Sequence, residues 1–146
     1  MKIQKNSILQ KVFLCLLMFN MTGYADEIVV VVNKNNSENH LDKNDIEQIF
    51  LDKAEFFPNG TNALPVNYSY MSKNNALRAK FEKELLGKSQ NQIRAYWSRL
   101  VFTGTGKLPR EVLSSGDVGD LIANVPGTIA YINKSEVNNS MKIIYP

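Results

Sequence analysis

The sequence predicts an α/β fold, a mixed sheet flanked by helices, and three observations support this class. A β-branched run at positions 28–32 (IVVVV) has no polar alternation, which is typical of a strand covered on both faces, as in a parallel sheet flanked by helices. Further strand candidates occupy positions 63–68, 128–132 and 141–145. Segments with helical spacing separate them, and strands that alternate with helices favour an α/β sheet.

Two helices are predicted between the first strand and position 87. Asp42 can cap the first, in which apolar residues recur with helical spacing at Ile46, Ile49 and Phe50. The second is predicted from about Lys73. Its apolar residues lie four apart, at Leu77, Phe81 and Leu85, and Gly87 is placed to end it. Charged residues of this helix, at positions 80, 82, 83, 84 and 88, are expected on its solvated face.

Two more helices are predicted before the last strands. Ser89 and Gln92 have the spacing of a capping box, which predicts a third helix at that point. Its apolar residues are Ile93, Tyr96, Trp97 and Leu100. The fourth is predicted from about Ser115, with apolar residues at 118, 121, 122 and 125, and Pro126 ends it. No repeat or linker divides positions 26–146, so we expect one domain there.

The first 25 residues have the pattern of a cleavable signal peptide. Lys2, Lys5 and Lys11 form a basic leader, and an apolar run follows at 12–18. Small residues at 23 and 25 suit cleavage before Asp26. We therefore expect export, with residues 26–146 as the mature domain. The alternative is an uncleaved membrane anchor, although the run is shorter than the ~20 residues of a spanning helix.

Removing that leader changes the charge and the cysteine count of the chain. Fourteen basic and fourteen acidic residues remain, because all three basic residues of the leader are lost. The net positive charge is therefore no indication of a nucleic-acid partner. Cys15 is the only cysteine and also lies in the leader, so the mature domain is expected to depend on its core and not on disulfides.

The residue types of the mature chain do not favour an enzyme, a metal site or a cofactor. His40 is the only histidine and lies in a polar stretch that predicts a solvated loop. The acidic pairs 42/45 and 117/120 stand where helices are predicted to begin, so capping is the better explanation for them. The glycines at 104 and 106 precede Lys107 but not the Ser or Thr of a nucleotide loop, and a helix-ending turn explains them.

The best ligand candidate is the start of the second predicted helix. The unpaired N–H groups of a helix start and the helix dipole favour an anion. The candidate site residues are Ser72, Lys73, Asn74, Asn75 and Arg78. Ser72 could equally be a plain N-cap. Arg78 could bind phosphate or carboxylate in a bidentate manner, or cover the helix with its aliphatic stem.

Several strings, in this order, resemble the PstS-like substrate-binding proteins of phosphate ABC transporters. They lie at 32–33, 41, 45–53, 64–66, 77–78 with 81, and 126–132. The stretch 93–104 (IRAYWSRLVFTG) resembles short, stand-alone members of that group. The resemblance implies a periplasmic protein with a type II periplasmic-binding-protein fold, in which two α/β lobes close over an anion. This chain has about half the length of such a clamshell, so the expectation is a single lobe.

The resemblance weakens at the ligand loop. Full-length relatives have an Arg, an Asp and a Ser-Gly-Thr series after the strand that corresponds to positions 64–68. Here positions 68–75 read YSYMSKNN, so only Ser72 and the nearby helix start carry over. A single lobe also leaves an anion half in water, where charge interactions are screened.

Two functions from different classes follow. The first is an exported binding domain that holds phosphate or another small oxyanion weakly at the helix start near Ser72, with or without a transporter partner. The alternative is a periplasmic interaction module for an envelope protein, which has lost ligand capture and exposes Tyr68, Tyr70 and Met71. The opposing possibility is that these tyrosines complete the core.

Overall fold

The computed structural model describes residues 26–146, so the predicted signal peptide lies outside the described residues. The elements along the chain are β1 (Ile28–Asn33), α2 (Lys43–Phe50), β2 (Leu64–Tyr68), α3 (Asn75–Glu84), α4 (Gln90–Thr103), β3 (Arg110–Val112), α5 (Ser115–Asn124), β4 (Thr128–Asn133), the 3-10 turn η1 (Lys134–Glu136) and β5 (Met141–Tyr145). All four predicted helices and all four predicted strands are present. Within the described residues, no helix is both long and apolar enough to cross a bilayer.

The five strands form one mixed sheet in the order β3-β2-β4-β1-β5. Strand β2 runs parallel to β3 and to β4, whereas β1 is antiparallel to β4 and to β5. The predicted burial of β1 on both faces is confirmed, because Val29 to Val32 are inaccessible to solvent. The parallel pairing suggested by that burial is wrong for β1. Helices cover both faces of the sheet, so a central strand is buried whatever the direction of its neighbours.

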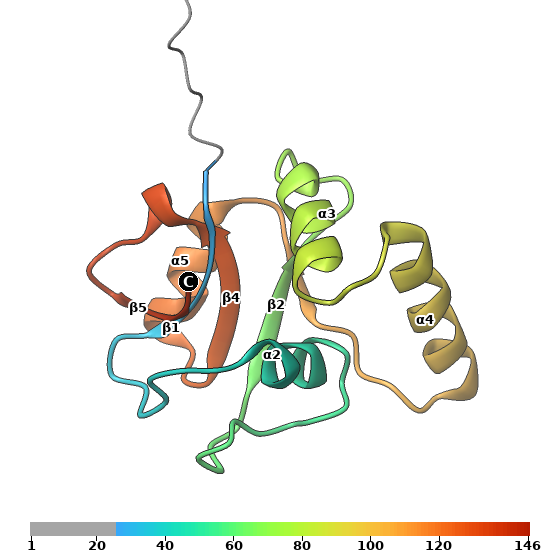
Figure 1. Cartoon of the computed structure of the whole chain (residues 1–146), viewed down its shortest axis with the longest axis horizontal. Coiled ribbons are helices and arrows are strands. Elements are labelled where there is room, and N and C mark those ends of the chain that lie inside the picture. The colour runs from blue at the N-terminus through green and yellow to red at the C-terminus, as the bar shows by residue number, and fades with distance from the viewer. Residues whose placement is uncertain (1–25) are drawn as a thin grey trace, which may run out of the picture.

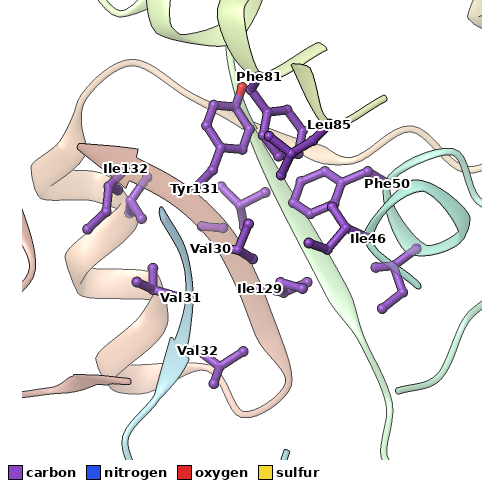
Figure 2. Close-up of a cluster of buried hydrophobic side chains, with 14 of the residues drawn as sticks. Val30, Val31, Val32, Ile46, Phe50, Phe81, Leu85, Ile129, Tyr131 and Ile132 are labelled. Carbon is purple, nitrogen blue, oxygen red and sulfur yellow. The ribbon is translucent and has the colours of Figure 1, made fainter. Parts of the chain in front are cut away.

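Helices lie on both faces of the sheet (Figure 1). Helix α5 contacts β4, β1 and β5, whereas α3 contacts β2 and β4. Figure 2 shows Tyr131 of β4 with Phe81 of α3 and Phe50 of α2, while Val31 lies nearer α5. The Phe81 and Tyr131 rings stack with centroids 3.8 Å apart, and the centroids of Phe50 and Phe81 are 4.8 Å apart. This aromatic cluster fixes α2 and α3 on one face of the sheet.

Helix α4 lies on the far side of α3 from β1 and β5 (Figure 1). It attaches to the core through Ile93 and Trp97, which are buried, and through Tyr96, whose hydroxyl donates to the Leu51 carbonyl oxygen at 2.6 Å. Gly104 ends α4 in the left-handed conformation, with φ of 67°. The prediction of a helix-ending glycine turn is therefore confirmed.

One strand and one boundary differ from the sequence prediction. Strand β3 was not predicted, because it has only three residues and two of them, Arg110 and Glu111, are charged. Helix α3 begins at Asn75 and not near Lys73, because the preceding residues form a separate turn. In that turn the Ser72 amide donates to the Ser69 carbonyl oxygen at 2.9 Å.

Candidate functional site

The predicted site lies at the carboxyl end of β2, where the chain turns into α3. A second helix start lies at the same edge of the sheet, because β3 runs parallel to β2 and leads directly into α5. A hydrogen bond joins the two connections: the Ser72 hydroxyl donates to the Leu113 carbonyl oxygen at 2.6 Å. In open α/β sheets this edge is the usual place for a ligand.

The start of α3 is not capped by a side chain. Asn74 occupies the N-cap position, but its side chain accepts no hydrogen bond from the helix, and the first turn contains no acidic residue. The Asn74 carboxamide oxygen is buried and has no partner among the described residues. The amides of Ala76 and Leu77 also find no acceptor within residues 26–146. The two free amides make this helix start electropositive, as expected for an uncapped helix. The buried Asn74 oxygen is an acceptor and does not add to that potential.

Three of the predicted site residues shape this helix start. The Ser72 hydroxyl accepts from the Asn74 amide at 3.0 Å, and the Ser72 carbonyl oxygen accepts from the Asn75 amide at 3.0 Å. The Asn75 side-chain oxygen accepts from Gln90 Nε2 at 2.7 Å, which ties the helix to α4. Ser72 is buried. Ser72 thus forms the turn before α3 and is not its N-cap, because Asn74 occupies that position.

Lys73 is the charged residue of the predicted set that remains in solvent. Lys73 is exposed, and it makes no ion pair with any residue in the described part of the chain. It precedes the free amides of Ala76 and Leu77 by three and four residues, so its long side chain can reach an anion held there. Lys73 can therefore add a flexible positive charge to the electropositive helix start.

Arg78 lies one turn inside α3 and is already paired by the protein. Its Nε donates to Glu82 at 2.8 Å, and its Nη1 donates to Glu111 at 2.8 Å and to the Tyr68 carbonyl oxygen. Its guanidinium carbon lies 3.5 Å from the centroid of the Tyr70 ring. Arg78 is only 3% exposed, so neither sequence interpretation, an exposed bidentate ligand or a surface stem, describes its position.

The acidic partners of Arg78 explain its charge state. Burial opposes the charge of Arg78, but the hydrogen bonds that Arg78 donates to Glu82 and Glu111 outweigh it and raise the pKa of Arg78. Burial also raises the pKa of Glu82, against the opposing hydrogen bond from Arg78. Glu82 is fully buried, so the expectation that it lies on the solvated face is wrong. Glu82 follows Arg78 by four residues, so this pair can be seen in the sequence. Glu111 lies 33 residues from Arg78, so that pair cannot.

The other carboxylates singled out in the sequence mostly cap helices, as predicted. Asp42 and Asp45 form a capping box at α2, and Ser89 and Gln92 form one at α4. At α5 the box is made by Ser114 and Asp117. Asp120 differs, because its carboxylate caps no helix. Its backbone oxygen accepts a hydrogen bond from the Asn124 side chain. His40 is exposed in a loop, and no group of metal-ligating side chains occurs within residues 26–146.

The predicted docking residues separate in the structure. Tyr68 belongs to the core and is almost completely buried, so its predicted exposure is wrong. Tyr70 is partly buried beneath Arg78, and burial raises the pKa of its hydroxyl. Met71 alone is open to solvent, at 92% exposure. The three residues therefore do not form a shared apolar surface.

Solved structures show where this fold has been seen before. An ABC-type phosphate transport receptor from Vibrio cholerae matches with a TM-score of 0.63 and 18% identity, over 82% of this chain and 45% of that one. PstS from Borrelia burgdorferi matches with a TM-score of 0.60 and 12% identity, over 82% and 47% of the two chains. A structure from Clostridium perfringens that contains bound phosphate matches with a TM-score of 0.62 and 18% identity, over 82% and 44%.

These similarities confirm the predicted fold class, an α/β lobe of the periplasmic-binding-protein kind with a mixed sheet flanked by helices. The chain spans less than half the length of each of these proteins. No protein-family model matches the chain, and no curated protein sequence matches it.

Proposed function

We propose that residues 26–146 form a PstS-like substrate-binding domain that holds phosphate or another small oxyanion weakly at the start of α3. The observation that carries the proposal is the uncapped start of this helix at the carboxyl end of β2. Its free amides, the helix dipole and Lys73 supply positive potential without any carboxylate in the first turn. Ser72, Asn74 and Asn75 shape the site. Arg78 supports it from beneath, since its guanidinium is already paired.

The geometry accounts for weak binding. Residues 26–146 supply one α/β lobe, and an anion held by that lobe keeps part of its hydration shell. Charge interactions at such a surface are screened by water and salt. A domain of this kind acts as a binding protein, not as an enzyme, and needs no metal or cofactor. The matched proteins include a phosphate transport receptor and a substrate-binding protein with bound phosphate. We extend phosphate, export to the periplasm and a transporter or envelope partner to this chain as part of the proposal.

The interaction-module alternative has less support. It depends on an exposed aromatic and methionine surface, but Tyr68 is buried and Tyr70 is partly covered by Arg78. Only Met71 remains exposed, and a single exposed apolar side chain is ordinary for a protein surface.

Thermal unfolding with increasing phosphate or sulfate tests the anion site. A ligand at 100 times its dissociation constant stabilises the folded state by about 2.7 kcal/mol. For a domain of this size, that raises the midpoint by several degrees. Asn74→Asp places a carboxylate at the α3 start, as α5 already has, so the phosphate-induced shift should disappear.

The matched control is Asn91→Asp, which adds the same charge in the first turn of the capped helix α4. This variant should keep the phosphate-induced shift. The proposal fails if phosphate and sulfate at tens of millimolar leave the midpoint of the parent protein unchanged. It also fails if the two aspartate variants respond alike.

A further inference from the structure

A cleft lies between α4 and the segment that leads into β3, and Tyr70 forms part of its lining. Its volume is about 340 Å³, close to the lower limit for small-molecule pockets. Helix α4 contributes Arg94, Trp97 and Val101, and the β3 side contributes Leu108 and Glu111. Arg78 also lines the cleft, but its guanidinium is already paired with Glu82 and Glu111.

Arg94 gives this cleft a positively charged end. Its guanidinium carbon lies 4.4 Å from the centroid of the Tyr70 ring, so the aromatic face helps to hold it. Unlike Arg78, it forms no ion pair with any residue of the described chain. An arginine that is oriented by a ring and has free N–H groups is well suited to bind a carboxylate.

Apolar side chains form the other end of the cleft. Val101 is 55% exposed and Leu108 is 52% exposed, although both are hydrophobic. The Trp97 side chain is almost fully buried and belongs to the same lining. Positions 94, 98 and 101 recur with helical spacing, so they lie along one face of α4. Seven residues of helix separate the charged end from Val101 by about 10 Å.

The other charged residues that line the cleft are Arg78 and Glu111, and Glu111 is the acidic one. One of its oxygens accepts from Arg78 at 2.8 Å, so its charge is compensated within the protein. It lies on the β3 side of the cleft, across from α4. Arg94 is then the one cleft-lining cation without an ion-pair partner among the described residues, which matches a ligand with a single carboxylate.

We propose that this cleft binds a small monocarboxylate with an apolar chain. The carboxylate is held by Arg94, and the chain lies against Trp97, Val101 and Leu108. Inorganic phosphate has no apolar part and gains nothing from these walls. The cleft is therefore a second binding site for a different class of anion. It shares the paired Arg78 with the site at the start of α3 but none of residues 72–75.

Calorimetric titration of the purified protein with hexanoate tests the proposal, with acetate and 1-hexanol as partial ligands. Hexanoate should bind roughly tenfold more tightly than either one, because each lacks one of the two contacts. Arg94→Gln should remove the preference for hexanoate over hexanol. Val101→Asn should remove the preference for hexanoate over acetate.

Arg99→Gln is the matched control, since Arg99 is an exposed arginine of the same helix that does not line the cleft. It should leave hexanoate binding unchanged. Equal affinities for hexanoate and acetate, or equal losses in the Arg94 and Arg99 variants, would overturn the proposal. Asn74→Asp separates the two sites. The Asn74→Asp variant should lose its response to phosphate and still bind hexanoate. If Asn74→Asp loses hexanoate binding while Arg94→Gln retains it fully, the proposal is also overturned.

Discussion

Helices α3 and α5 begin at the same edge of the sheet, after the parallel strands β2 and β3, but their first turns differ. At α5 the Asp117 carboxylate accepts from the Ser114 hydroxyl at 2.8 Å, from the Ser114 amide at 2.9 Å and from the Leu113 amide at 3.2 Å. At α3 no carboxylate occupies the equivalent position. The start of α5 thus carries its own anion, whereas that of α3 has room for one from solution.

The same contrast separates two arginines. Arg78 is buried and paired with Glu82 and Glu111, whereas Arg94 lies in solvent over the Tyr70 ring. Positive groups whose carboxylate partners belong to the protein stabilise the fold, because their charge would otherwise be costly to bury. Positive groups without such partners are the ones available to a ligand. The distinction gives separate expectations for stability and for binding.

The largest effect is expected when the paired arginine is removed. Arg78→Met leaves the Glu82 carboxylate buried without its cation, so the free energy of unfolding should fall by about 3–5 kcal/mol. Urea denaturation measures the loss. Arg99→Met is the control on an exposed arginine, and its effect should stay within about 0.5 kcal/mol. A stable Arg78→Met protein that no longer responds to phosphate would instead show that Arg78 is a ligand, as the sequence predicts.

A smaller effect is expected from Ser72→Ala, which cuts the bond between the two helix starts. The Leu113 carbonyl oxygen and the Asn74 amide both lose a partner, at a cost of roughly 1–3 kcal/mol. Hydrogen exchange should also become faster at the amides of Leu113 and Ser114. Ser69→Ala is the control, because the Ser69 hydroxyl bonds only within its own turn. If Ser72→Ala changes the phosphate response alone, Ser72 contacts the ligand and does not couple the helices.

The parts of this comparison that could be predicted depend on short sequence distances. The capping boxes of α2 and α4 are visible because their partners are three residues apart. The four helices follow from apolar residues recurring every three or four positions. The helix whose start is the proposed anion site was also predicted, although it begins two residues later than expected, at Asn75.

The parts that could not be predicted depend on contacts between distant segments. The Arg78–Glu111 pair spans 33 residues and the Ser72–Leu113 bond spans 41. Local spacing does not encode either, so Arg78 appeared free and Glu82 appeared solvated. Strand β3 depends on pairing with β2, since its own three residues do not favour a strand. The role of Arg94 became visible only when Tyr70 was found beneath it.

The smallest expected effect is the acid dependence of the capped helix start. The side-chain hydrogen bond from Ser114, helped by the amides of Leu113 and Ser114, holds the pKa of Asp117 below its ordinary value of 3.8. A lowered pKa in the folded state means that the cap stabilises the protein above pH 3.8. That contribution is lost as the pH falls through the lowered pKa. Because the carboxylate is exposed, salt should weaken the effect.

Asp117→Asn makes this dependence measurable. The difference in unfolding free energy between the parent and this variant should be greatest near neutral pH and shrink as the solution is acidified below pH 3.8. At α3 the opposite change, Asn74→Asp, should create an acid-dependent cap where none exists. A difference between parent and Asp117→Asn that stays constant down to the acid limit would contradict the assignment. It would show that Asp117 acts through its shape and hydrogen bonds, not through its charge, and the contrast between the two helix starts would then not be electrostatic.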